Sequence, residues 1–208
     1  MTRAASDPPA MMRVGAVVLA AGAGSRFGGG KLLAILDGRP VLQHVLDAIA
    51  AAGIEATTVV LGADAAAVEE AVSWRRERRI VNPRPADGLS SSLRLGIRDA
   101  AASEPPPDAL LVALGDQPRL RPEVVRALVE ALASDASRPI AVPAYADDRG
   151  RNPVLLGRAA WRLADDAVGD RGLGPLLAAE PALVAAVPVP GDNPDVDTPA
   201  DLARLATR

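Results

Sequence analysis

From Val14 to Lys31 the chain reads VGAVVLAAGAGSRFGGGK. Its first seven residues, Val14–Ala20, form an apolar run of the length of a buried strand, and five glycines follow before Lys31. A strand that runs directly into a glycine-rich loop is typical of the first unit of an open α/β sheet. We therefore take Val14–Ala20 as the first strand and the loop as a candidate ligand site.

The same alternation continues through most of the chain. Apolar or β-branched runs predict strands over 57–61, 80–81, 109–114 and 140–142. Helical spacing predicts helices from Pro40 through 41–49, over 65–74, from Gly88 through 97, and over 124–132. Strands that alternate with helices of this length indicate βαβ units and a parallel sheet covered on both faces.

After Tyr145 the alternation weakens. The residues 147–150 predict a turn, 154–156 a returning strand, 183–189 a late strand, and Pro199 the start of a closing helix. We expect these segments to form an antiparallel addition to the same sheet. The predicted fold is a three-layer α/β/α domain with a mostly parallel, Rossmann-like sheet over 13–208, and residues 1–12 are expected to be a disordered leader.

The composition excludes several classes of ligand and partner. Aromatic residues make up 2% of the 208 residues and the formal net charge is −3, so we expect no nucleic-acid partner. The chain has no cysteine and one histidine, so a bound metal would be held by oxygen, which favours Mg²⁺ or Mn²⁺. No segment reads as a membrane span, and Asp7 and Pro8 argue against a secretory signal, so we expect a cytoplasmic protein without a membrane partner.

The glycine loop fits a triphosphate. Glycines let backbone N–H groups approach an anion, and Arg26 and Lys31 add two cations. The loop is not a Walker A motif, because Ser25 stands where that motif needs glycine and Leu32 where it needs Ser or Thr. It fits the dinucleotide fingerprint poorly, because Phe27 replaces the third glycine and no acidic residue closes a second strand at the expected distance. A purely flexible connection is the remaining alternative.

A second polar segment, Gly115-Asp116-Gln117-Pro118, follows the predicted strand 109–114. Ligands of open α/β sheets gather outside the carboxyl ends of the strands. We therefore expect Asp116 to lie near the glycine loop. A carboxylate at the end of a buried strand is a ligand that Mg²⁺ takes from proteins, while phosphates and water fill its other positions.

These residues resemble a known signature. The pattern Leu-Ala-Ala-Gly-x-x-Ser-Arg-Phe-Gly-x-x-Lys-Leu-Leu is similar to that of the MobA-like nucleotidyltransferases, and most similar to the molybdenum cofactor cytidylyltransferases. The resemblance extends over 14–205 through three further segments, which are 82–96, 115–118 and 195–202. It implies a fold like that of the nucleotide-diphospho-sugar transferases.

The resemblance implies a role for each segment. Arg26, Lys31 and Asp116 would be catalytic, and Asp116 would hold the metal together with Asp195 or Asp197. Asp197 could instead be only a helix cap. The residues that would bind the nucleotide are Leu19, Ala20, Ala21, Gly22, Gly24, Ser25, Arg26, Lys31, Asn82, Ser91, Ser92 and Asp116.

The implied reaction moves CMP from CTP to a phosphorylated acceptor. By resemblance the acceptor is molybdenum-bearing molybdopterin, and a molybdoenzyme or its chaperone could be a transient partner. Three alternatives stay open: a GTP-using guanylyltransferase, an NAD(P)H-dependent oxidoreductase of the nicotine blue oxidoreductase type, and a nucleotide-binding module without activity. Asn152 stands where many relatives carry histidine, which leaves the acceptor open, and His44 is expected to be structural.

Overall fold

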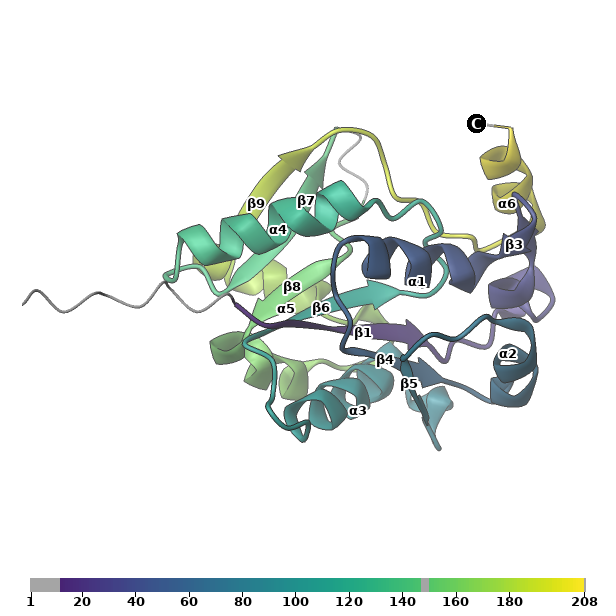
Figure 1. Cartoon of the computed structure of the whole chain (residues 1–208), viewed down its shortest axis with the longest axis horizontal. Coiled ribbons are helices and arrows are strands. Elements are labelled where there is room, and N and C mark those ends of the chain that lie inside the picture. The colour runs from purple at the N-terminus through teal and green to yellow at the C-terminus, as the bar shows by residue number, and fades with distance from the viewer. Residues whose placement is uncertain (1–11, 147–149, 208) are drawn as a thin grey trace, which may run out of the picture.

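The computed structural model describes residues 12–146 and 150–207. Most of the expected leader, the first three residues of the turn expected at 147–150, and Arg208 lie outside this part of the chain. Within it, seven strands form one sheet in the order β5-β4-β1-β6-β8-β7-β9 (Figure 1). These strands are β1 (Val14–Ala20), β4 (Thr57–Leu61), β5 (Arg78–Val81), β6 (Ala109–Leu114), β7 (Ile140–Tyr145), β8 (Val154–Gly157) and β9 (Val184–Val189).

Strand β1 occupies the centre of the parallel part. It pairs with β4 on one side, with Ala16 opposite Thr57, and with β6 on the other, with Leu19 opposite Leu114. Strand β8 runs antiparallel to both β6 and β7, as expected for a returning strand. The late strand expected over 183–189 is β9, and its predicted antiparallel direction was wrong, because β9 runs parallel to β7.

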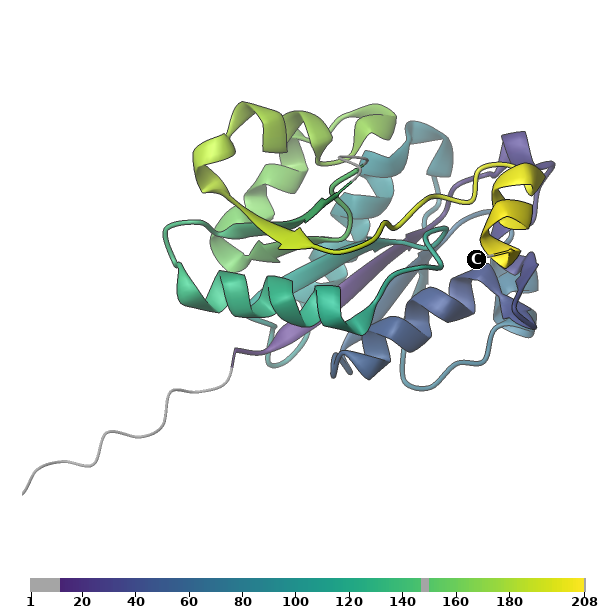
Figure 2. The same ribbon diagram turned by 90° about the horizontal axis from the view of Figure 1, so that it is seen from above.

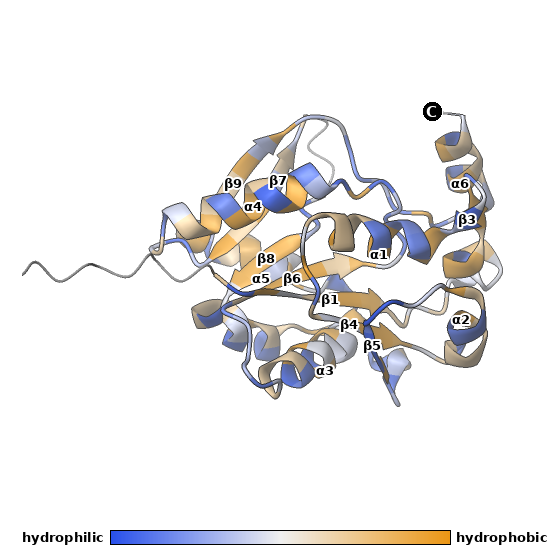
Figure 3. Cartoon of the chain, viewed as in Figure 1, coloured by the Kyte–Doolittle hydropathy of each residue, from blue (hydrophilic) through white to orange (hydrophobic). Residues whose placement is uncertain are grey.

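Helices cover both faces of the sheet, which confirms the three-layer prediction. They are α1 (Val41–Ala51), α2 (Ala65–Ala71), α3 (Leu89–Ala101), α4 (Pro122–Ser134), α5 (Gly174–Ala179) and α6 (Pro199–Ala206). Helices α1, α2 and α4 pack on one face, and α3, α5 and a 3₁₀ segment, Arg158–Asp166, pack on the other (Figure 1). The strands between them are the most apolar part of the chain (Figure 3).

The core follows from the alternation of side chains along each strand. Val18 of β1 and Leu111 of β6 contribute to the cluster under α1 and α4, whereas Val17 and Leu110 contribute to the cluster under α3. All four side chains are fully buried. Because successive side chains point to opposite faces, a strand buried on both faces must be apolar throughout. This requirement explains the uninterrupted apolar run of β1.

Several boundaries differ from the predictions. Pro40 is the N-cap of α1 rather than part of its first turn, because it ends a short hairpin of β2 (Ile35–Leu36) and β3 (Arg39–Pro40). Helix α2 ends at Ala71 rather than at residue 74. Met12, assigned to the leader, packs against the core. In the described residues no helix is long and apolar enough to cross a membrane.

The C-terminal helix closes over the start of the chain. Val196 and Leu205 form a buried cluster with Leu36 of the hairpin, and Phe27 of the glycine loop packs against it. Figure 2 shows α6 beside the loop that follows β1. The closing motif and the glycine loop are therefore neighbours, although about 170 residues separate them in the sequence.

Candidate active site

The carboxyl ends of β1 and β6 bring two of the predicted segments together. The Gly115 amide donates to the carbonyl oxygen of Leu19 at 2.9 Å, which extends the parallel pairing by one residue beyond β6. The glycine loop therefore leaves the sheet beside Asp116, as the positions of the two motifs predicted. A third segment joins them, because the Val196 amide donates to the carbonyl oxygen of Asp116 at 2.9 Å.

Two short 3₁₀ turns, Ser25–Phe27 and Lys31–Leu33, shape the glycine loop. Gly24 and Gly30 begin them with φ angles of 58° and 64°, a left-handed conformation that favours glycine. Among the described residues, the amides of 22–24 donate to no protein acceptor. Unpaired amides in a loop at a strand end are suited to bind an anion.

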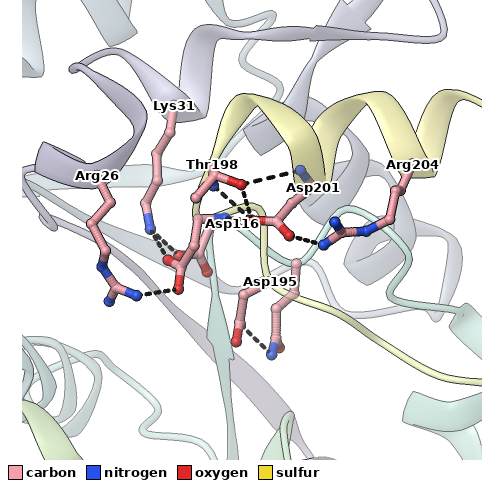
Figure 4. Close-up of polar contacts among 9 residues, drawn as sticks. Arg26, Lys31, Asp116, Asp195, Thr198, Asp201 and Arg204 are labelled. Atoms are coloured by element: carbon pink, nitrogen blue, oxygen red, sulfur yellow. Dashed lines mark hydrogen bonds and ion pairs between the residues drawn. The ribbon is translucent and has the colours of Figure 1, made fainter.

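Four charged side chains meet at this edge of the sheet (Figure 4). The Lys31 ammonium forms a short ion pair with Asp116 and lies 3.4 Å from Asp197 Oδ1. Arg26 approaches the other oxygen of Asp197 at 3.1 Å. Lys31 is the only lysine of the sequence, and its side chain is 12% exposed, whereas that of Arg26 is 77% exposed. The predicted catalytic residues Arg26, Lys31 and Asp116 are thus in one cluster.

Lys31 is held in its charged form. Partial burial alone would lower the pKa of Lys31, but the carboxylates of Asp116 and Asp197 outweigh this effect and raise the pKa above its ordinary value. A permanently charged ammonium that is only slightly exposed is suited to bind phosphate oxygens.

The two candidates for the second metal carboxylate have different surroundings. Asp197 shares the Lys31 cation with Asp116, whereas the Asp195 carboxylate accepts a hydrogen bond from Gln117 Nε2 at 2.8 Å. Asp195 keeps contact with solvent, yet the protein atoms around its carboxyl group reduce its hydration and raise its pKa, and the charges of Asp116 and Asp197 add to this effect. Asp197 is therefore better placed than Asp195 to share a cation with Asp116.

The chemistry of these carboxylates fits a divalent cation. Asp116 Oδ1 is buried and has no hydrogen-bond partner in the described part of the chain, while Lys31 contacts Oδ2. A metal could therefore approach Oδ1 while Lys31 keeps its contact. The described residues contain no group of three or more acidic or histidine side chains close enough to form a complete metal site. Phosphates and water would have to supply further ligands, as is usual for Mg²⁺.

The closing motif contains residues that the sequence interpretation did not single out. Asp201 Oδ2 accepts hydrogen bonds from the amides of Asp197 and Thr198, and the Thr198 hydroxyl accepts from the Asp201 amide. This is a capping box at the start of α6. It places Asp197 just before the helix, facing Lys31. The sequence Thr-Pro-Ala-Asp carries the signal for this cap.

Three of the predicted nucleotide-binding residues, Asn82, Ser91 and Ser92, also lie together. The Asn82 amide group donates to Ser91 Oγ at 2.8 Å and to Ser92 Oγ at 2.9 Å, and its oxygen accepts from the Arg84 amide. The side-chain nitrogen and oxygen of Asn82 thus both bond to protein groups. Asn82 thereby orients Ser91 and Ser92 at the start of α3. His44 is hydrogen-bonded to the carbonyl oxygen of Leu36, in keeping with the structural role expected for it.

Fold and site together define a class of protein. The same fold is found in the CTP complex of CMP-2-keto-3-deoxy-manno-octonic acid synthetase. That structure superposes with a TM-score of 0.71 at 18% identity and covers 94% of this chain and 97% of its own, which shows the fold alone. The class defined by this similarity is that of the proteins with the nucleotide-diphospho-sugar transferase fold.

A family model assigns the chain to a narrower group than the fold does. Residues 16–186 match the model of the MobA-like NTP transferase domain, so the chain belongs to the MobA-like NTP transferase family. Relatives carry different names. Nicotine blue oxidoreductase of Paenarthrobacter nicotinovorans is 33% identical over 91% of this chain and 94% of its own. The bifunctional protein GlmU of Desulfitobacterium hafniense is 30% identical over 67% of this chain. The matched region is 30% of the length of that GlmU protein.

Solved structures are similar over nearly the whole chain. Rv0371c of Mycobacterium tuberculosis superposes with a TM-score of 0.82 at 29% identity and covers 95% of this chain and 100% of its own. The same protein in complex with manganese gives a TM-score of 0.78 at 28% identity, over 95% and 99% of the two chains. A nucleotidyl transferase from Methanothermobacter gives 0.75 at 28% identity, over 94% and 96%.

Proposed function

We propose that this chain transfers CMP from CTP to a phosphorylated acceptor and releases pyrophosphate. The observation that carries the proposal is the cluster in which Lys31 contacts both Asp116 and Asp197, beneath a glycine loop with unpaired amides. Such a cluster combines a largely buried cation for phosphate oxygens with carboxylates for a metal. Membership of the MobA-like NTP transferase family supports this assignment.

In this reaction a phosphate oxygen of the acceptor attacks the α-phosphorus of CTP. A new P–O bond forms as the bond between the α-phosphorus and the bridging oxygen breaks, and the leaving pyrophosphate keeps that electron pair. The nucleophile is already anionic near neutral pH, so the protein needs to align and neutralise charge rather than move a proton. Lys31, Arg26 and the amides of 22–24 would bind the phosphate oxygens.

We assign the metal, Mg²⁺ or Mn²⁺, to Asp116 and Asp197. When bound, it would neutralise phosphate oxygens as the charge shifts toward pyrophosphate. The unpartnered Asp116 Oδ1 supports this assignment, as does the manganese complex of the similar protein Rv0371c.

The proposed nucleotide and acceptor follow from the sequence motifs. The Leu-Ala-Ala-Gly form of Leu19–Gly22 favours CTP over GTP, and Ser91 and Ser92 at the start of α3 would offer hydroxyls to the base. Molybdenum-bearing molybdopterin is the acceptor that the resemblance suggests. A molybdoenzyme or its chaperone would then receive the product.

A second candidate is an NAD(P)H-dependent oxidoreductase. It is favoured by the 33% identity to a protein named nicotine blue oxidoreductase over 91% of this chain. It differs from the transferase in its ligand, a dinucleotide, and in needing no divalent metal at Asp116.

Binding of CTP, GTP, ATP and NADPH to the purified chain, each with Mg²⁺ and with EDTA, separates these functions. We expect stabilisation by CTP that requires Mg²⁺ and is lost in Asp116→Asn. Stabilisation by GTP instead would change the nucleotide but keep the reaction class. A response to NADPH alone, unchanged by EDTA, would refute the transferase proposal.

A further inference from the structure

A polar cavity of about 380 Å³ lies beside the ion cluster, against the C-terminal segment. This volume is in the range of small-molecule sites. It is next to Asp197 but on the far side of the carboxylates from the glycine loop, where Asp195 is held by Gln117 (Figure 4). The lining residues that matter here are Gln117, Asn152, Asn193, Asp195, Asp197 and Arg204.

A chain of hydrogen bonds orients two amide side chains in this cavity. The NH₂ group of Gln117 faces Asp195 and donates to its Oδ1 at 2.8 Å. The Gln117 oxygen then faces Asn193 and accepts from its NH₂ group at 3.1 Å. The remaining atom of this chain, Asn193 Oδ1, is therefore a hydrogen-bond acceptor.

Asn193 Oδ1 accepts no hydrogen bond from the part of the chain that the structure describes. Asn193 is 7% exposed, and this oxygen is buried without a hydrogen-bond partner among the described residues. Buried polar atoms in native proteins are nearly always paired, because an unpaired one loses its hydration without compensation. An N–H group of a ligand in the cavity would supply the missing partner.

The charges around the cavity favour the same kind of ligand. Among the residues that the structure describes, four aspartates line it, Asp192, Asp195, Asp197 and Asp201, against one arginine, Arg204. The Arg204 guanidinium is already paired with Asp201. A negatively charged group would be repelled here, so the phosphate of an acceptor belongs on the Lys31 side of the site.

We infer that this cavity binds the body of the acceptor through an N–H donor group, either an amine or an amino-substituted nitrogen heterocycle, which donates to Asn193 Oδ1 and Asp195. Gln117 acts as a positioning residue that keeps both acceptors oriented. The inference rests on the proposed function, because that function places an acceptor next to the nucleotide. Acceptors whose bodies carry carboxylates are excluded by the same arrangement.

Three planar probes of nearly equal shape test the inference: benzamidine, benzamide and benzoate. The first two carry N–H donors, and the third carries only acceptors. Binding to the full chain is measured by calorimetry or ligand-observed NMR. We expect both donors to bind at least about tenfold more tightly than benzoate, and to lose about tenfold or more in Asn193→Leu. Asp165→Asn, which changes an exposed side chain outside the cavity, is the control and should leave donor binding unchanged.

The comparison of probes on the unchanged chain remains decisive if Asn193→Leu does not fold. Equal or tighter binding of benzoate, or no binding of either donor, would overturn the inference. Binding of CTP with Mg²⁺ is measured separately on the same chain. Its absence would refute the nucleotidyltransferase proposal, whereas the preference among the probes reports only on the cavity.

Discussion

At the scale of single residues, Lys31 and Asp116 are the strongest test of the site. Lys31→Gln or Asp116→Asn should each reduce the rate of pyrophosphate release by about 10²–10³-fold, because the first removes a cation for the phosphate oxygens and the second removes the charge of a metal ligand. The measurement is single-turnover pyrophosphate release from CTP with an acceptor. Asp108→Asn, at the opposite end of β6, is the matched control. If Asp116→Asn kept full activity, the catalytic assignment would be wrong.

The positions of some site residues could be predicted from the sequence and those of others could not, for a physical reason. Lys31 and Asp116 follow apolar strands, and the carboxyl ends of parallel strands share one edge, so their proximity could be predicted. Gln117 and Asn193 are 76 positions apart, and no local pattern links them. Their contact depends on how the segment after β9 returns to the sheet.

At the scale of elements, Gly96 sets how closely α3 approaches the sheet. A Cβ atom there would overlap the side chain of Val17 in β1 and press on Val60 in β4. Gly96→Ala should therefore lower the free energy of unfolding by about 1–3 kcal/mol. Gly174→Ala, at the start of α5 where a Cβ meets no atom within 4 Å, is the control and should be neutral or slightly stabilising. Urea unfolding measures the free energy of unfolding of both variants. An equal loss in Gly96→Ala and Gly174→Ala would contradict the role given to Gly96.

A second element-scale prediction concerns Asp47 of α1, which binds Arg39 of the hairpin and Arg75 of the loop after α2. Partial burial alone would raise the pKa of Asp47, but hydrogen bonds from Arg75 and Gln43 and the charge of Arg39 outweigh it and lower the pKa. The unfolded chain then binds this proton more readily than the folded one. The stabilisation is therefore complete above the ordinary value of 3.8 and is lost as the pH falls through the lowered pKa.

Asp47→Asn should consequently lower the free energy of unfolding by about 1 kcal/mol at pH 7, which corresponds to about 2–4 °C in Tm. The difference from the unchanged chain should shrink as the pH falls below 3.8. Thermal unfolding at a series of pH values measures it. Asp165→Asn, which removes an exposed ion pair with Arg98, should change little at any pH. A difference for Asp47→Asn that is independent of pH would contradict the electrostatic explanation.

Regular elements were the predictable part of the fold, and short ones were not. Strands of five to seven residues leave an apolar run in the sequence, and amphipathic helices leave a helical period. The hairpin β2–β3 has strands of two residues, which are too short to leave either pattern. The direction of β9 depends on its pairing with β7, which its own sequence does not specify.

At the scale of the whole molecule, one sheet joins two cores, so both should unfold together. Leu110 and Leu111 are adjacent in β6, are both fully buried, and belong to opposite clusters. Leu110→Ala and Leu111→Ala should each cost about 2–5 kcal/mol. Calorimetry should show one transition in both variants, shifted to a lower temperature. Two separate transitions in either variant would mean that the layers unfold independently.

Lys31 has one more consequence, because it is the only lysine of the sequence and its ammonium lies within the site. A chain grown on ¹⁵N-labelled lysine would carry a single side-chain ammonium resonance. That resonance would come from the atom that contacts both Asp116 and Asp197. Metal, nucleotide and acceptor could each be followed at this one nucleus, without assignment of the remaining spectrum and without any substitution.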